Sequence, residues 1–311
     1  MKLKKSFLGA GLGVAALLLA ACGNANPLGE SSSAAPSGGG SSAGGQAIVV
    51  GSADFTESRV LAEIYSQALK AKGLQSSTKL GIGAREIYIK ALQDKSISVV
   101  PEYTGNLLIN FDPSATATTP DDVEKALPSA LPSSLKVLKS SPAADQDVYV
   151  VTKDYAAKNN IASIADLAKI APNSVLGGPP ELEKRSYGPP GLAKLYGVKF
   201  KEFRPYAKYP PKIADLDSNK IQVATFFTTD SVISAKGYVE LKDPKSMILP
   251  QNVVPLVRSE VATNSTATSA LEAVGAALTT DQLVALDAKV DTDHQDPGTV
   301  AGDWLKSKGL A

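Results

Sequence analysis

Aromatic side chains follow or end several strand-like segments of this sequence. Tyr103 follows one such segment, Tyr149 lies inside another, and Phe226 and Phe227 end a third. Ring faces attract a soft cation without the desolvation penalty of a buried carboxylate. If these strand ends face one cleft, the rings predict a site for a small cation. For any one of these rings taken alone, a place in the hydrophobic core is the favoured interpretation.

Arg185 lies in a Gly/Pro-rich loop, residues 185–192, that opens a helical segment. A guanidinium near a helix N-terminus stands where an anion is already favoured, and its planar fork suits a carboxylate. The alternative is a solvated surface residue or an ion pair with Glu183. The segment Tyr206–Pro211 is both aromatic and basic, and we predict an exposed loop there without a function.

The first elements that must position these residues form a strand, helix, helix, strand series. Asp54 and Glu57 are suited to cap the first helix, which Gly73 would end. No hairpin signal separates the two strands, so the order favours a parallel α/β sheet. The predicted strands are 47–51 and 97–101, and the apolar faces of the predicted helices span 60–69 and 87–92.

The same alternation of strands and helices returns further along the chain. It predicts two α/β lobes crossed twice by the chain, with lobe 1 spanning 47–148 and completed by 254–311, and lobe 2 spanning 149–253. Ligands of open α/β sheets lie beyond the carboxyl ends of the strands, so we expect the ligand in the inter-lobe cleft. The later strands are predicted at 147–152, 174–176, 221–224 and 253–257, and the later helices at 164–167, 269–278 and 280–288.

The N-terminal residues predict export. Three lysines precede an apolar run that ends in Leu-Ala-Ala-Cys at Cys22, so residues 1–21 are predicted to be a signal peptide. The run is too short and too rich in glycine for a spanning helix. Its end resembles the bacterial lipobox, which implies that Cys22 carries a lipid; an ordinary signal peptide with a coincidental cysteine is the alternative. Residues 22–46, rich in Ser, Gly and Pro, are predicted to form a flexible tether.

This leader predicts a folded part on the outer face of the cytoplasmic membrane, which is the periplasmic side if two membranes are present. The chain holds 32 basic and 31 acidic residues, so nothing indicates a nucleic-acid partner. His294 is the sole histidine and Cys22 the sole cysteine. The chain therefore lacks the residues for Cys–His catalysis or for a His-rich metal site. Binding is therefore favoured over catalysis, with no cofactor and no metal.

Five segments in consistent order resemble the substrate-binding proteins of glycine betaine/carnitine/choline ABC importers. The resemblance extends from about Ile48 to Leu310. The segments that carry it are Pro101–Asn106, Arg185–Leu192, Thr228–Asp230, Pro250–Pro255 and Val300–Leu305. The resemblance implies a two-lobed periplasmic-binding-protein fold of type II. It also implies a cage of tyrosines around a quaternary ammonium group and an arginine that takes the ligand carboxylate.

Carried over by position, the resemblance implies that Tyr103 and Tyr149 match two cage tyrosines. Phe227 stands in the place of a third and keeps the ring without the hydroxyl. Gln251 stands where a fourth tyrosine is expected, and Arg185 matches the arginine that binds the carboxylate.

The other implied changes concern the polar end of the pocket. Asn106 replaces a threonine or serine, Asp54 stands near the place of a frequent lysine, and Thr228 would also line the cleft. Asp54, Arg85 and Glu86 would then be selectivity residues, although capping or salt bridges would explain them equally well. These departures predict weak betaine binding or a preference for choline or a neutral solute.

The function predicted from the sequence is an extracytoplasmic solute-binding protein of an ABC importer. It would act as a monomer, capture glycine betaine, choline or carnitine, and deliver it to a permease and ATPase that other chains supply. A sensor or receptor for a different neutral or aromatic solute is the alternative. A third hypothesis is an envelope enzyme that uses Asp54, Glu102 or Asp230.

Overall fold

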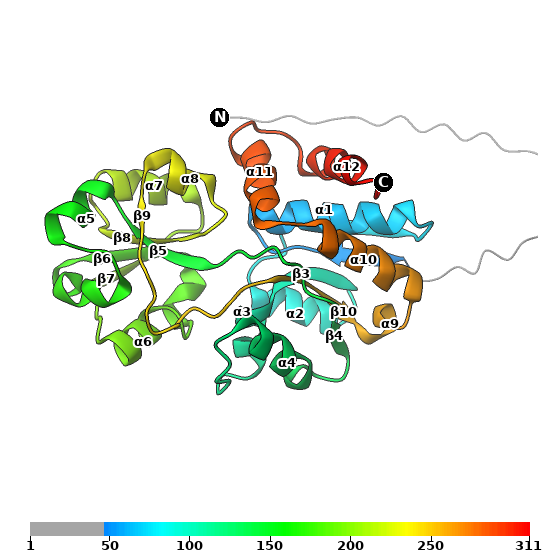
Figure 1. Ribbon diagram of the computed structural model, residues 1–311, viewed down its shortest axis with the longest axis horizontal. Coiled ribbons are helices and arrows are strands. Elements are labelled where there is room, and N and C mark those ends of the chain that lie inside the picture. Colours follow the sequence, from blue (N-terminus) through cyan, green and yellow to red (C-terminus); the bar gives the residue numbers. More distant parts are fainter. Residues whose placement is uncertain (1–46) are drawn as a thin grey trace, which may run out of the picture. The chain divides into compact units, whose positions relative to one another are not determined.

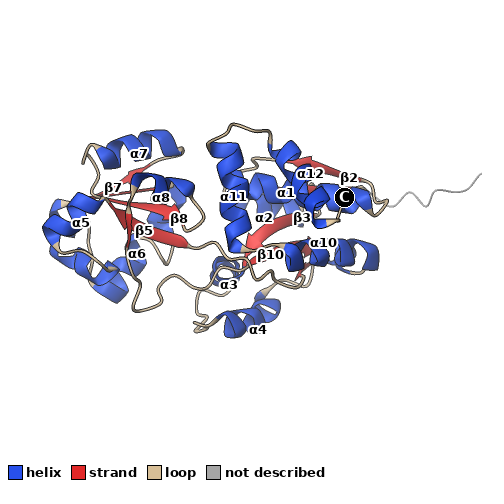
Figure 2. Cartoon of the chain, turned by 45° about the horizontal axis from the view of Figure 1, so that its top comes forward, coloured by secondary structure: helices blue, strands red, loops and turns tan. Residues whose placement is uncertain are grey.

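The computed structural model describes residues 47–311. The predicted signal peptide, Cys22 and the predicted tether lie outside the described residues. The described residues belong to one compact unit, and this unit contains two five-stranded sheets, each covered by helices (Figure 1). The strands of the two sheets and the helices that cover them stand out in Figure 2.

The first sheet has the strand order β2-β1-β3-β10-β4. Its strands are β1 (Ile48–Gly51), β2 (Ser76–Lys79), β3 (Val99–Tyr103), β4 (Leu135–Val137) and β10 (Val253–Arg258). β1 is parallel to β3, as predicted, and also to β2, a strand that the sequence did not predict. β10 is antiparallel to β3 and β4. The prediction of a parallel sheet is therefore wrong for β10, because this strand enters the sheet on the return of the chain from the second sheet.

The second sheet has the strand order β7-β6-β8-β5-β9. Its strands are β5 (Asp147–Val151), β6 (Val175–Gly178), β7 (Glu202–Pro205), β8 (Val223–Phe227) and β9 (Val239–Glu240). β6 is parallel to β7 and β8, while β5 is antiparallel to β8 and β9. The chain thus enters this sheet through β5 and leaves it after β9. We call the sheet β2-β1-β3-β10-β4 with its helices the first lobe and the other sheet with its helices the second lobe.

Helices cover both faces of each sheet (Figures 1 and 2). The first lobe has α1 (Thr56–Ala71), α2 (Arg85–Gln93), α3 (Thr104–Phe111), α4 (Pro120–Ala130), α9 (Ser259–Ala262), α10 (Ser265–Ala277), α11 (Thr280–Asp291) and α12 (Pro297–Lys308). The second lobe has α5 (Lys153–Asn159), α6 (Pro189–Gly191), α7 (Tyr209–Asp217), α8 (Ser231–Lys236), short 3₁₀ segments at Ile164–Lys169, Ala171–Asn173 and Pro180–Lys184, and a π-helical turn at Leu192–Tyr196.

Helix α1 organises the core on one face of the first sheet. Its apolar residues recur at helical spacing, and Leu61 and Ile64 are fully buried against α10, α11 and α12. The predicted cap at Asp54 is wrong: the helix begins after Phe55, and no side chain caps its N-terminus. Asp54 instead pairs with Arg59, and Glu57 is buried.

The motif Pro101–Asn106 contains a glycine that lets α3 pack closely against the segment that returns from the second lobe. A Cβ atom at Gly105 would lie 2.5 Å from the carbonyl oxygen of Pro250 and 2.6 Å from Cβ of Leu249. The segment that returns from the second lobe therefore fills the space that a side chain would need.

Replacing Gly105 by alanine should destabilise the protein by about 1–3 kcal/mol, because the added methyl group has to displace backbone atoms. The matched control is Gly275→Ala in α10, where the nearest atom to a new Cβ is 3.8 Å away and helix propensity improves by up to about 1 kcal/mol. Urea unfolding of the two variants measures the difference. Equal stability of the two variants would contradict the packing argument.

Candidate functional site

A cavity of about 320 Å³ lies between the two lobes and is lined by residues of both. Its volume is within the range of small-molecule sites. The first lobe contributes residues that follow β1, the start of α2 and the end of β3. The second lobe contributes the start of β5, the segment 179–187, the start of α7 and the end of β8. The cavity therefore lies beyond the carboxyl ends of the parallel strands, as expected for open α/β sheets, and the first residue of the antiparallel strand β5 also lines it.

Three aromatic rings of the cavity wall lie close together. The ring centroid of Phe55 is 5.2 Å from that of Phe227 and 6.2 Å from that of Tyr103. Phe55 comes from the loop after β1, Tyr103 from β3 and Phe227 from β8, so both lobes contribute. Phe55 was not predicted as a site residue, because it lies in the loop four residues after the end of β1 and no local pattern marks it.

Further aromatic residues line the cavity: Tyr88, Tyr187, Tyr206, Tyr209 and Phe226. The segment Tyr206–Pro211 was predicted to be an exposed loop without a function. That prediction is wrong for Tyr206 and Tyr209, whose rings are half-buried and whose hydroxyls donate to Asp215 and Asp230.

Five of the eight predicted ligand-binding residues line the cavity and three do not. Those in the wall are Asp54, Tyr103, Asn106, Arg185 and Phe227, and those outside it are Tyr149, Thr228 and Gln251.

The three residues outside the wall hold the wall residues in place. Tyr149 is only 1% exposed, packs in the second-lobe core, and donates its hydroxyl to the Tyr187 carbonyl at 2.7 Å. Gln251 Nε2 donates to Asn106 Oδ1 at 2.7 Å, and its Oε1 accepts from the Asn106 backbone N–H. Thr228 donates to Asp145. In this structure the three side chains support the wall from behind and do not line the cavity.

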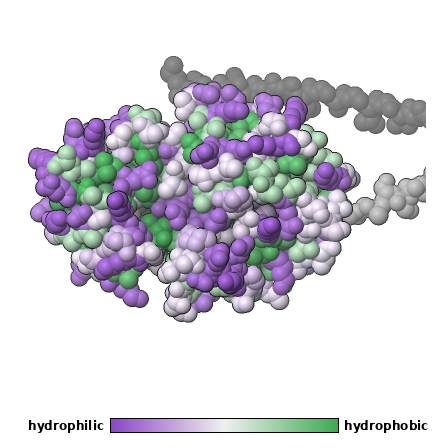
Figure 3. All heavy atoms as spheres, in the orientation of Figure 1, coloured by the Kyte–Doolittle hydropathy of each residue, from purple (hydrophilic) through white to green (hydrophobic). Residues whose placement is uncertain are grey.

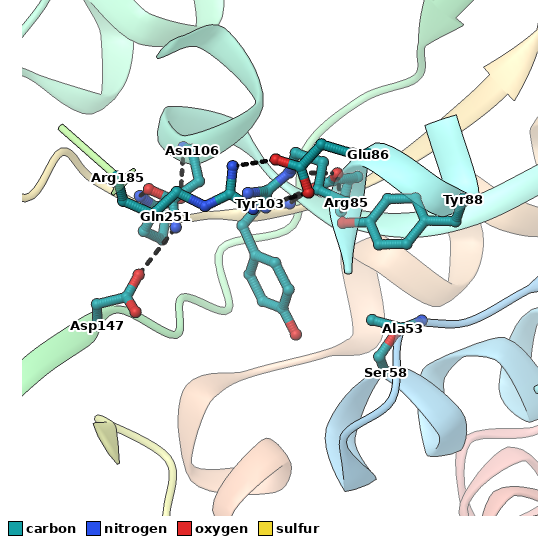
Figure 4. Close-up of polar contacts among 11 residues, drawn as sticks. Ala53, Ser58, Arg85, Glu86, Tyr88, Tyr103, Asn106, Asp147, Arg185 and Gln251 are labelled. Atoms are coloured by element: carbon teal, nitrogen blue, oxygen red, sulfur yellow. Dashed lines mark hydrogen bonds and ion pairs between the residues drawn. The ribbon is translucent and has the colours of Figure 1, made fainter. Parts of the chain in front are cut away.

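Asn106 joins the two lobes beside the cavity (Figure 4). Its Nδ2 donates to Asp147 Oδ2 at 2.9 Å, while Gln251 fixes the other end of the amide. Burial raises the pKa of the Asp147 carboxyl, although the Asn106 bond opposes the shift.

Arg185 reaches from the second lobe to Glu86 of the first (Figure 4). Arg185 Nη2 lies 3.1 Å from Glu86 Oε2, and Nη1 bonds the other carboxylate oxygen. The predicted alternative partner, Glu183, is not involved. The arginine that the sequence analysis assigned to a ligand carboxylate is therefore paired with a carboxylate of the protein.

Arg85 is also neutralised. Its Nε and Nη2 lie 2.8 and 3.0 Å from the two oxygens of Glu102, which is fully buried and also accepts from the Tyr88 hydroxyl. All of Asp54, Arg85 and Glu86 thus take part in ion pairs. The salt-bridge alternative that the sequence left open describes their contacts.

A group of buried carboxyls lies behind Tyr103: Glu57 of α1, Asp145 of the first crossing and Asp287 of α11. The Tyr103 hydroxyl donates to Glu57 Oε1. Burial raises the pKa of Glu57 to about 7 and that of the other two well above the usual range. Within residues 47–311, these carboxyls do not form a set of ligands suited to a metal ion.

The two lobes, the two crossings and an aromatic cavity between them define a bilobal solute-binding protein. The chain belongs to the family described as the substrate binding domain of ABC-type glycine betaine transport systems, whose model matches residues 46–307. This membership confirms the importer family predicted from the sequence motifs and, with it, the predicted class of function, an osmolyte-binding protein of ABC importers.

The chain is 26% identical over 276 residues to the glycine betaine-binding protein YehZ of Escherichia coli (strain K12), covering 84% of this chain and 90% of that protein. Its fold is similar to a structure described as a glycine betaine/carnitine/choline ABC transporter, with a TM-score of 0.67, 21% identity, and 85% and 99% of the two chains covered. It is also similar to closed, glycine betaine-bound lactococcal OpuAC, with a TM-score of 0.62, 14% identity, and 85% and 96% covered. These likenesses confirm the predicted two-lobed type II fold.

The family is one of transport proteins that bind substrates and not a family of enzymes. Among the helices of residues 47–311, none has the length and apolar character required to cross a membrane. Hydrophilic and hydrophobic residues are interspersed over the face seen in Figure 3.

The stability of the protein should fall as the pH rises through the pKa of Glu57. Burial raises its pKa from 4.5 to about 7, so the folded state holds the proton more tightly than the unfolded state does. The stability that this proton provides is complete below pH 4.5 and is lost as the pH rises through about 7. The groups that face Glu57 are Tyr65, Tyr103, Asp145, Asp230 and Asp287, with no cation among them. Ionisation of Glu57 should remove about 3 kcal/mol of stability.

Urea unfolding at several pH values between about 5 and about 8 measures this effect. Glu57→Gln should flatten the dependence, whereas Glu272→Gln, an exposed residue of α10, should keep the wild-type slope. A Glu57→Gln variant with the wild-type slope would contradict the assignment.

Proposed function

We propose that this protein captures a small quaternary ammonium osmolyte, with glycine betaine as the first candidate, and delivers it to the permease of an ABC importer. The observation that carries the proposal is the group of rings Phe55, Tyr103 and Phe227 at the wall of the inter-lobe cavity. Family membership and the betaine-binding names of the relatives support the choice of ligand.

The three rings suit a trimethylammonium group because a ring face attracts a cation even when the cation carries no N–H donor. Such a cation is weakly hydrated compared with a primary ammonium, so ring faces can replace its water. Each cation–π contact contributes about 0.5–2 kcal/mol when the cation is desolvated. Phenylalanine retains the ring face, so the change from tyrosine at Phe227 removes a hydroxyl and not the attraction.

Contacts between the lobes support a closing mechanism in which the ligand is buried. Asn106 with Asp147, and Arg185 with Glu86, bridge the lobes on the cavity side of the two crossings. Hinge closure of a two-lobed protein forms such bridges and buries the bound solute. The closed form would then present surfaces of both lobes to the permease.

Several further parts of the proposal rest on the sequence. Cys22 would carry the lipid that holds the protein at the outer face of the cytoplasmic membrane, and the protein would act as a monomer with a permease and ATPase from other chains. We also propose that it has no catalytic activity. Glu102 supports this view, because it is fully buried and held by Arg85 and Tyr88.

Calorimetric titration of the full chain with glycine betaine tests the ring assignment. Phe55→Leu and Phe227→Leu should each weaken binding by about 3–30-fold, because an aliphatic side chain of similar size offers no negative ring face. The matched control is Phe200→Leu, which makes the same change at a partly buried residue of the second-lobe core outside the cavity wall.

The control should keep wild-type affinity. Equal losses in all three variants, or no loss in the cavity variants, would contradict the aromatic cage. Absence of heat from glycine betaine, choline and carnitine with the wild-type chain would contradict the proposed class of ligand.

A further inference from the structure

The cavity wall contains a third cationic residue besides Arg85 and Arg185. Lys212 lies on α7 and is only 3% exposed. Both arginines are held by glutamates, whereas Lys212 makes no ion pair with a carboxylate in the part of the chain that the structure describes. Its ammonium group is therefore the cavity's cation without a counter-ion in contact.

The surroundings of Lys212 leave part of its hydrogen-bonding capacity unused. Its Nζ donates to the carbonyl oxygen of Thr225 at 2.6 Å, the single hydrogen bond that it makes within residues 47–311. An ammonium group has three N–H donors. The other two donors make no hydrogen bond to an oxygen or nitrogen atom within residues 47–311, so an entering carboxylate would compete for them only with ring faces.

The ammonium of Lys212 also occupies two ring faces. Its Nζ is 4.2 Å from the ring centroid of Tyr209 and 4.0 Å from that of Phe226. These two rings are consequently taken by a cation of the protein itself. A ligand cation would be repelled from this end of the cavity and attracted to the rings of Phe55, Tyr103 and Phe227.

We propose that Lys212 binds the carboxylate of the ligand and so selects zwitterionic betaines over cationic alcohols such as choline. The inference rests on the proposed function and adds to it the residue that recognises the anionic end. It also corrects the role that the sequence analysis gave to Arg185, whose fork is already engaged by Glu86.

The charges around Lys212 are consistent with this role. Burial lowers the pKa of Lys212 to about 8. The negative charges of Asp230 and Asp147, which lie beyond ion-pair distance, favour the protonated form and oppose this shift. Asp230 is itself held by the Tyr209 hydroxyl at 2.8 Å and by the backbone N–H of Phe227. A carboxylate in contact with Lys212 would offset the desolvation of the ammonium and stabilise its charged form.

Calorimetric titrations of the full chain with glycine betaine and with choline test the assignment. Lys212→Met keeps the length of the side chain and removes the charge, so betaine binding should weaken by about tenfold or more while choline binding is unchanged or tighter. Arg185→Met is the matched control, since the same change at the other candidate should weaken betaine binding less. Lys212→Arg, which retains the charge, should keep more betaine affinity than Lys212→Met.

A second measurement follows proton uptake when ligands bind to the wild-type chain. At a pH of about 8, close to the pKa of Lys212, betaine binding to the wild type should take up protons, seen as a dependence of the heat on the ionisation enthalpy of the buffer. Choline binding should show a smaller uptake. The proton uptake that is due to Lys212 should be absent in the Lys212→Met variant. Any uptake by Glu57 or Asp230 should persist there, because this variant keeps both residues.

The outcomes separate this inference from the proposed function. A wild type that binds neither ligand overturns both. A wild type that binds choline but not betaine, a Lys212→Met variant that binds betaine as tightly as wild type, or one that loses both ligands equally overturns the role of Lys212 alone. If Arg185→Met loses more betaine affinity than Lys212→Met, Arg185 and not Lys212 binds the carboxylate of the ligand.

Discussion

The need to neutralise buried charge between two lobes determines how this cavity is built. A charged group that leaves water is strongly destabilising unless another charge or several hydrogen bonds compensate it. Arg85 is matched by Glu102 within the first lobe, and Arg185 by Glu86 across the lobes. These pairs leave Lys212 as the cavity cation whose charge a ligand can balance.

The same constraint explains why the wall has two chemically different parts. The rings of Phe55, Tyr103 and Phe227 lie close together in the wall, and no cation of residues 47–311 lies over them. The rings of Tyr209 and Phe226 already face the ammonium of Lys212. A zwitterion matches both parts at once, because its soft cation and its carboxylate find separate partners. A cation that lacks a carboxylate would leave Lys212 unsatisfied.

Much of the fold follows from periodicity in the sequence. The helical spacing of apolar residues located α1, and buried apolar runs located β1, β3, β5 and β10. β2 was missed because its residues, Ser-Ser-Thr-Lys, contain no apolar side chain and its position depends on pairing with β1. The antiparallel direction of β10 was also not predictable, because it depends on the path of the chain through the second lobe.

The site was predicted less completely, since exposure to a cavity depends on tertiary packing. Tyr149 matched a family position, yet its place on β5 directs the ring into the second-lobe core. Phe55 and Lys212 were missed because nothing local distinguishes a ring after a loop aspartate, or a lysine after two prolines, from surface residues. Pairing of Arg185 with Glu86 joins residues that are far apart in the sequence, which no local pattern indicates.

In this protein a betaine is expected to lie between the lobes, with its ammonium end at the three rings and its carboxylate end at Lys212. A crystal structure of the full chain grown with glycine betaine tests it most directly. We predict the trimethylammonium group against Phe55, Tyr103 and Phe227, and a carboxylate oxygen within hydrogen-bond distance of Lys212 Nζ. A ligand bound outside this cavity, or one whose ammonium group lies away from these rings, would contradict the account.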